Sequence, residues 1–204
     1  MILKVFFLGM AATLPAALIE LGFAEKLSEL SLPPFFLEIL YVFIGVALVE
    51  EAVKYLVVKK RVLKDPEFDE PLDVMLYMVI AALGFAALEN LLVLFPLLNP
   101  FQLFETVVVS SFRFVGATFL HALCSGLLGY FLALSFFNPK NRFKMLGLGL
   151  FTVMLLHGLY NFSIMKIEGN LKFILPIIIL ISLALFVSLG FKKLKKLKSV
   201  CKIT

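Results

Sequence analysis

The stretch Val49-Glu50-Glu51-Ala52-Val53-Lys54-Tyr55 places two carboxylates and a lysine inside an apolar run, residues 35–58. If this run crosses a membrane, each ionisable side chain costs about 2.5–3.5 kcal/mol or more at the centre of the bilayer. Side chains that costly are functional candidates, and they require partners elsewhere in the bilayer. Glu50 and Lys54 lie four residues apart, so a helix puts them on one face in the favourable order for an ion pair.

The composition is that of a membrane protein. Apolar residues make up 62% of the chain and the mean hydropathy is +1.05, whereas soluble domains contain about 45–50% apolar residues. The 204 residues provide for about six spans of ~20 residues with short loops. The sequence therefore predicts an all-α, polytopic bundle of transmembrane helices in the cell membrane, with residues 1–204 forming a single integral-membrane domain.

Six apolar segments are the expected spans. They cover residues 5–23, 35–58, 74–98, 113–137, 145–165 and 173–191. The stretch 101–137 is too long for one helix and short for two, so we expect an extra interfacial or re-entrant helix at 101–112. Residues 22–24 resemble a signal-peptide cleavage site, but the long apolar run before them predicts an uncleaved first helix.

The basic residues lie at the ends of the expected spans. Fourteen Lys and Arg residues fall on the side that holds the N-terminus, the loops 59–73 and 138–144 and the basic tail, and three fall on the other side. This bias predicts that both termini are cytoplasmic. The net charge of +5 follows the same topology. We therefore expect the lipid bilayer, and no nucleic acid, as the partner of these basic residues.

Further polar residues lie in the other expected spans. They include both histidines of the chain, and they are Glu89, Asn90, Arg113, His121, His157 and Asn161. Glu89, His121 and His157 fall about 20–24 Å from the cytoplasmic ends of their spans, whereas Glu50 falls only ~12 Å from residue 58. Extension of the second span through Leu63, or a tilt of that span, would bring Glu50 towards the same layer.

Two interpretations of these polar residues remain open. Acids, bases and an amide that converge from four helices suit a buried hydrolytic site, where one group takes a proton from water and others stabilise an oxyanion. Alternatively, they form ion pairs and hydrogen bonds that hold packed helices together. Two known protease designs are excluded, because all three aspartates lie in the loop 59–73 and no H-E-x-x-H motif occurs.

Four motifs occur in order along the chain. They are Glu50-Glu51-x-x-Lys54, Phe85-x-x-x-Glu89-Asn90, Arg113 followed by His121, and His157-x-x-x-Asn161. This set resembles the PrsW family of intramembrane proteases. It is more distantly similar to the CAAX prenyl-endopeptidase and bacteriocin-processing family of the same superfamily, whose second motif carries histidine where Glu89 stands. The motif-bearing core covers about residues 40–165.

The resemblance implies a glutamate-dependent endopeptidase that cleaves membrane-embedded proteins, such as an anti-sigma factor, with a single-span membrane protein as substrate. Glu50 would then be the general base on water, with Glu51 supporting it. The other expected roles are water orientation or metal binding for Glu89 and His121, oxyanion stabilisation for His157 and Asn161, and support for Lys54, Asn90 and Arg113.

The resemblance leaves metal dependence open. Zinc accepts carboxylate and imidazole ligands, and Glu50, Glu89, His121 and His157 would be the ligand set. Lys54 and Arg113 would compete with a cation, which favours water activation without a metal. No cofactor is therefore firmly predicted, and Zn²⁺ remains the alternative.

Two other functions compete with proteolysis. One is a non-catalytic membrane scaffold, because the same superfamily is thought to include a scaffold subunit of gamma-secretase. The other is a proton-coupled transporter, because intramembrane Glu and His also build proton relays. The chain lacks the internal repeat that many transporters have.

Overall fold

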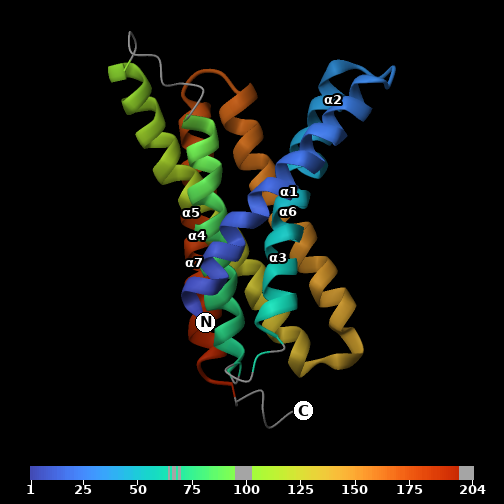
Figure 1. The fold of residues 1–204 in the computed structure, drawn as a ribbon, viewed down its shortest axis with the longest axis vertical. Helices are drawn as coiled ribbons and strands as arrows, with labels where there is room; N and C mark the ends of the chain where they lie inside the picture. The colour runs from blue at the N-terminus through green and yellow to red at the C-terminus, as the bar shows by residue number, and fades with distance from the viewer. Residues whose placement is uncertain (64, 66–67, 69, 95–102, 198–204) are drawn as a thin grey trace.

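The computed structural model describes residues 1–63, 65, 68, 70–94 and 103–197. For residues 103–113 it describes the backbone alone. Within these residues every regular element is helical. The helices are α1 (Ile2–Ser28), α2 (Pro34–Leu40), η1 (Tyr41–Leu48), α3 (Val49–Arg61), α4 (Pro71–Leu94), α5 (Leu103–Phe137), η3 (Pro139–Asn141), α6 (Arg142–Lys166) and α7 (Leu171–Leu194). The predicted all-α bundle is thus confirmed (Figure 1).

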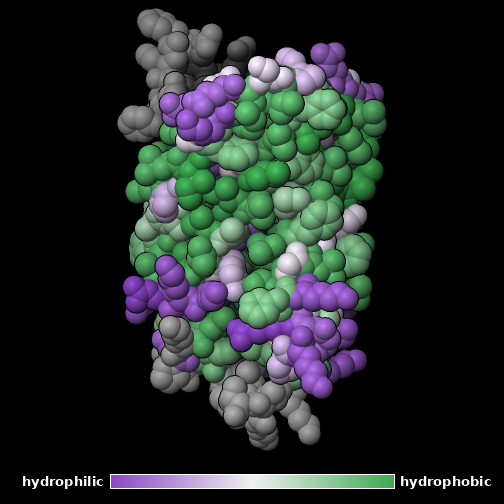
Figure 2. Space-filling model, turned by 90° about the vertical axis from the view of Figure 1, so that its right-hand side faces the viewer, coloured by the Kyte–Doolittle hydropathy of each residue, from purple (hydrophilic) through white to green (hydrophobic). Residues whose placement is uncertain are grey.

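Five of the described helical stretches are long and apolar enough to cross a membrane. They are Ile2–Ser28, Pro71–Leu94, Phe114–Phe137, Pro139–Lys166 and Leu171–Leu194. Figure 2 shows an apolar belt between two bands of hydrophilic side chains, the surface expected of a multi-pass membrane protein. The first residues of α1 and the last residues of α7 lie towards the same end of the bundle (Figure 1), in agreement with the predicted topology.

The expected second span is divided among three elements. Residues 34–61 run through α2, η1 and α3 without a break in the helical backbone, and η1 is a π-helix of 8 residues. Wide π-turns are rare, and they often lie next to functional sites. Here the π-helix ends at the residue before Val49, so Glu50 and Glu51 stand in the first turn of the α-helix that follows.

The region 101–137 requires a correction. The interfacial or re-entrant helix expected at 101–112 is not a separate element, because α5 is one helix of 35 residues that begins at Leu103. Residues 101 and 102 lie outside the described part. The sequence between Leu103 and Phe137 contains no proline, so nothing in it breaks the helix. At ~1.5 Å per residue, α5 is longer than the ~30 Å thickness of the hydrocarbon core. Figure 1 shows α5 running obliquely to α4.

Glycines allow the closest approaches between helices. A side chain at Gly84 of α4 would collide with the backbone of Phe6 in α1, and one at Gly9 would collide with the backbone of Ala81. Likewise, a side chain at Gly158 of α6 would collide with the Phe43 ring in η1. Small residues of this kind let membrane helices pack backbone against backbone. The Gly158 contact brings the segment that leads into Glu50 against the helix that carries His157.

Candidate active site

Four helices contribute buried polar side chains to one cluster in the apolar interior. Glu50, Glu51 and Lys54 come from α3, Glu89 from α4, His121 and Ser125 from α5, and His157 from α6. All of these side chains except that of Glu89 are almost completely buried. The Glu89 side chain is 24% exposed, so the cluster is closest to the surface at that carboxylate.

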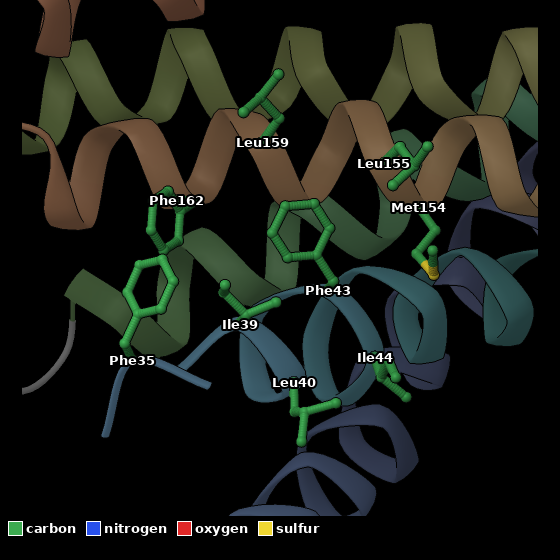
Figure 3. A pocket seen from close by; sticks show the side chains of 9 residues that line it. All are labelled: Phe35, Ile39, Leu40, Phe43, Ile44, Met154, Leu155, Leu159 and Phe162. Atoms are coloured by element: carbon green, nitrogen blue, oxygen red, sulfur yellow. The ribbon is translucent and has the colours of Figure 1, made fainter. Parts of the chain in front are cut away.

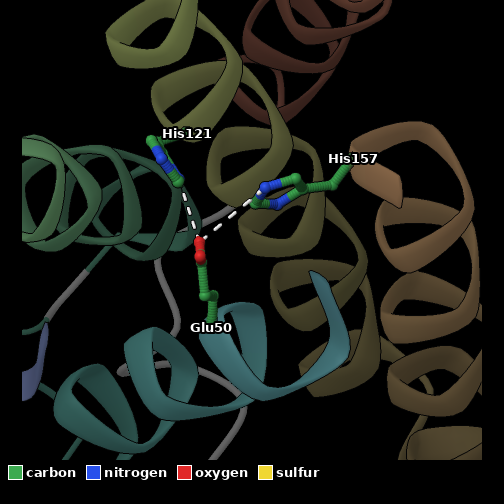
Figure 4. Close-up of side chains that lie close together, drawn as sticks. All are labelled: Glu50, His121 and His157. Carbon is green, nitrogen blue, oxygen red and sulfur yellow. Dashed lines mark ion pairs between the residues drawn. The ribbon is translucent and has the colours of Figure 1, made fainter. Parts of the chain in front are cut away.

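The two imidazoles converge on the Glu50 carboxylate. Its Oε2 lies 3.5 Å from His121 Nδ1 and 3.7 Å from His157 Nε2. The two rings meet edge to face, with their centroids 5.1 Å apart. Figure 4 shows both rings on the same side of Glu50. The sequence suggested that Glu50 lies at a different depth in the bilayer from the two histidines, but the three side chains meet. One reason is that α3 continues to Arg61, beyond the expected end of the second span at residue 58.

The outer nitrogen of each imidazole meets a second carboxylate. His121 Nε2 lies 2.6 Å from Glu89 Oε2, and His157 Nδ1 lies 3.2 Å from Glu51 Oε1. A neutral imidazole has one N–H donor and one lone pair, whereas an ionised carboxylate only accepts. The outer nitrogens therefore carry the N–H, and the lone pairs of His121 Nδ1 and His157 Nε2 face the side of Glu50.

Lys54 supplies the positive charge of the cluster. Its Nζ donates to Glu50 Oε2 at 3.2 Å, the pairing that the four-residue spacing predicts, and also to Glu51 Oε1 at 2.8 Å. The same Nζ lies 2.7 Å from His121 Nδ1 and 4.3 Å from the centroid of the Phe85 ring. A buried lysine with these partners offsets part of the negative charge that would otherwise destabilise the interior.

The two adjacent glutamates have different environments. Glu51 accepts hydrogen bonds from Lys54, His157 and Ser125, the last at 2.7 Å to its Oε2. Both of its oxygens are thus occupied by donors. Among the described residues, Glu50 accepts one hydrogen bond, from Lys54, and its carboxylate faces the two imidazole rings. Glu50 is therefore the carboxylate better placed for a water molecule, and Glu51 holds His157 and Lys54 in position.

Ser125 was not among the predicted site residues. It follows His121 by one helical turn, so it shares the face of α5 that meets α3. That spacing was the available signal, but serine in a membrane helix commonly serves packing, and only the contact with Glu51 assigns it to the site. Thr118, also absent from the predicted set, accepts a hydrogen bond of 3.1 Å from Asn90.

Three predicted residues either make no hydrogen bond to Glu50 among the described residues or have side chains outside the described part. Asn90 is half-buried and directs its amide to Thr118 on α5. Asn161 is half-buried one turn after His157, and no hydrogen bond joins it to Glu50 within the described residues. The side chain of Arg113 lies outside the described part of the chain.

The cluster contains a set of atoms that fits a divalent metal ion. One ligand atom each from Glu50, His121 and His157 can be chosen so that all three lie within 4.8 Å of one another. Two imidazoles and a carboxylate are the protein ligands of many catalytic zinc sites, which leave a fourth position for water. The carboxylates behind both histidines are the usual supports of such ligands. Glu89, included in the predicted ligand set, contacts the outer nitrogen of His121 instead.

An apolar groove lies where α2 and η1 meet α6. It has a volume of about 450 Å³ and is lined by side chains of α2, η1 and α6 (Figure 3). Phe43 and Ile44 line it from η1, and Met154 and Leu159 line it from α6. The groove is therefore formed where the segment that leads into Glu50 meets the helix that carries His157.

The fold and the cluster together define a class of protein. Carboxylates and imidazoles gathered inside a bundle of apolar helices are the catalytic groups expected of a hydrolase that works within a membrane.

The comparison with known proteins identifies the family. The chain matches the family described as "PrsW family intramembrane metalloprotease" over residues 1–189. It therefore belongs to the PrsW family, and it is an intramembrane endopeptidase of the cell membrane.

Individual relatives agree with this assignment. The chain is 28% identical over 201 residues to Protease PrsW of Bacillus subtilis (strain 168), covering 98% of this chain and 84% of the relative. It is 36% identical over 126 residues to Protease PrsW of Geobacillus kaustophilus (strain HTA426), covering 62% and 52%. It is 34% identical over 149 residues to Protease PrsW of Clostridioides difficile (strain 630), covering 72% and 60%. No solved structure matches the chain.

Proposed function

We propose that the Glu50–His121–His157 cluster is the site at which this endopeptidase hydrolyses its substrates, and that the substrates are single-span membrane proteins. The observation that carries the proposal is the convergence of one ligand atom from each residue within 4.8 Å in the buried interior. Groups placed this closely can hold one water molecule between an acid or base and two imidazoles. An anti-sigma factor is one substrate of this kind.

In this mechanism Glu50 takes a proton from the attacking water, because its carboxylate faces the imidazole lone pairs and carries fewer donors than that of Glu51. His157 directs its free Nε2 at the same place and orients the water, and His121 Nδ1, which lies 2.7 Å from Lys54 Nζ, would do so once that contact opens. This differs from the role in oxyanion stabilisation expected for His157, because its N–H is engaged by Glu51. Asn161, one turn from His157, and the buried ammonium of Lys54 are the proposed groups that stabilise negative charge.

A divalent metal ion fits the same residues. Glu50, His121 and His157 would hold it, with Glu51 and Glu89 supporting the two imidazoles. When bound, such an ion polarises a carbonyl and makes a bound water more acidic. The lone pairs of His121 and His157 would then hold the ion instead of the water, and proton removal would fall to the Glu50 oxygen that the ion leaves free.

The substrate would reach the site from the lipid. The apolar groove is lined by η1, which leads directly into Glu50, and by α6, which carries His157. An apolar transmembrane segment has matching chemistry and can approach sideways through the bilayer.

We further propose that residues 1–204 act as one integral-membrane domain in which α1 and α7 enclose the core of about residues 40–165. Thr13 of α1, for example, donates a hydrogen bond to the Phe85 carbonyl at 3.1 Å.

The test is cleavage of a panel of single-span reporter proteins co-reconstituted with the enzyme in liposomes. Glu50→Gln keeps the size of the side chain and removes its basicity, so cleavage should disappear. Glu38→Gln is the matched control, because Glu38 lies on the same helical stretch but pairs with Lys166 near the surface. A Glu50→Gln enzyme that cuts like the wild type would refute the proposed site. A chelator lane, with Zn²⁺ added back, decides the metal dependence.

A folded wild-type protein that cuts none of the reporters would instead favour the scaffold function. In that case, His157→Ala should impair the assembly of a partner complex and should change no cleavage reaction.

A further inference from the structure

The ammonium of Lys54 lies among the atoms that would bind a metal ion. Its Nζ is 2.7 Å from His121 Nδ1 and 3.2 Å from Glu50 Oε2, and its third close acceptor is Glu51 Oε1 at 2.8 Å. Lys54 is fully buried, so no water competes for these contacts. Two of the three candidate metal ligands are therefore already in contact with a cation that belongs to the chain.

His121 Nδ1 cannot accept a hydrogen bond from the Lys54 ammonium and bind a metal ion at the same time. Its Nε2 lies 2.6 Å from Glu89, which only accepts when ionised, so Nε2 carries the N–H and Nδ1 has the free lone pair. One lone pair takes either a hydrogen from Lys54 or a metal ion. Two positive charges at such a distance would also repel each other in a buried site. The hydrogen bond from Lys54 and a metal ion on Nδ1 are thus mutually exclusive.

We propose that Lys54 is the counter-cation of the metal-free site, and that a divalent metal ion binds only when the Lys54 ammonium releases His121 Nδ1. This inference rests on the proposed function of the cluster. Lys54 is here a positioning residue: it keeps His121 in the tautomer that a metal at Nδ1 requires, and it lowers the affinity for that metal. After release, the ammonium retains Glu51 Oε1 and the face of Phe85, 4.3 Å away.

Removal of the charge should therefore raise the affinity for zinc. Lys54→Met keeps an unbranched side chain and deletes the ammonium. The Kd for Zn²⁺ should fall at least about tenfold, the scale of one hydrogen bond to a charged group. Lys54→Arg, which keeps a permanent charge, should not lower the Kd. Lys166→Met is the matched control, because it removes a lysine that pairs with Glu38 outside the cluster, and its Kd should equal that of the wild type.

The affinities are measured by calorimetric titration of Zn²⁺ into detergent-purified protein whose affinity tag contains no histidine. A Kd for Lys54→Met that is equal to or higher than that of the wild type overturns the inference, as does the absence of zinc binding in both proteins. Cleavage of the liposome reporter by the wild type is followed in parallel. If that cleavage persists and depends on Glu50, the proposed function stands whatever the zinc titration gives.

A second measurement uses the wild type alone, so it does not depend on the folding of a variant. The chain has 2 histidines, and selective ¹⁵N labelling yields four ring-nitrogen signals, assigned with His121→Ala. Without zinc, His121 should be protonated at Nε2 and unprotonated at Nδ1. Addition of Zn²⁺ should shift the Nδ1 signal and leave Nε2 protonated. Zinc on Nε2 instead would leave the Lys54 contact intact and would overturn the inference.

Discussion

His121 Nε2 lies 2.6 Å from Glu89 Oε2, and this contact joins α5 to α4 behind the imidazole face that meets Glu50. The carboxylate fixes which ring nitrogen carries the proton, and it thereby leaves a lone pair on Nδ1, where the Lys54 ammonium lies 2.7 Å away. The cluster is therefore organised in two layers, with Glu50 between the two rings and a carboxylate behind each ring.

Glu89→Ala should lower activity by about 10- to 100-fold, the usual effect of removing a carboxylate behind a functional histidine. The protein should still fold, because the Glu89 side chain is 24% exposed and water can replace it. Turnover of the reporter in liposomes measures the effect. Asn90→Ala is the control, since Asn90 is the next residue and binds Thr118 instead. Equal activities of the two variants would contradict the role of Glu89.

Ser125→Ala should destabilise the protein by about 1.5–3 kcal/mol, because it removes a hydrogen bond to the buried, charged Glu51. Unfolding in mixed micelles, followed by circular dichroism, gives the free-energy difference. Ser135→Ala is the matched control: Ser135 is equally buried on α5, but it donates to the Leu132 carbonyl of its own helix. We expect its substitution to cost clearly less, and the reverse order would rule out the proposed support of Glu51.

Gly158→Ala should move η1 away from α6, because the added methyl group would collide with the Phe43 ring. Overpacking of this kind costs about 1–3 kcal/mol, and it should separate His157 from Glu50 and reduce reporter cleavage. Gly147→Ala on the same helix meets no atom within 4 Å and should behave like the wild type.

A compensating change tests the cause of that loss. Phe43→Leu in the Gly158→Ala background removes part of the ring that the methyl group would meet, so activity should recover in part. If Phe43→Leu restores no activity, the loss in Gly158→Ala has a cause other than the collision with the Phe43 ring.

Leu159→Trp should slow the cleavage of membrane-embedded reporters by filling the groove between η1 and α6. It should not affect the cleavage of a short soluble peptide, because the Glu50 cluster is untouched. The ratio of the two kcat/KM values measures the effect. Phe151→Trp is the control, since Phe151 is an exposed apolar residue of α6 outside the groove lining. A loss that is equal for both substrates would speak against lateral access through this groove.

Much of the fold could be predicted because hydropathy and helical spacing are local properties. Long apolar runs bounded by basic residues predict spans, and residues four apart share a face, as Glu50 and Lys54 do. The single helix α5 was not predicted, because span length was inferred from bilayer thickness, which does not limit a helix that runs obliquely or extends beyond the bilayer. The π-helix η1 has no pattern of its own in the sequence either.

The sequence alone determined that this chain is a helical membrane protein and that Glu50, Glu51, Glu89, His121 and His157 belong to motifs on separate spans. Tertiary structure decided which atoms meet: the inner nitrogens of both rings at Glu50, the outer ones at Glu89 and Glu51, and Ser125 and Lys54 around them. The reason is that distances between helices depend on crossing geometry and on close contacts such as that of Gly158 with Phe43, which no local pattern along the chain encodes.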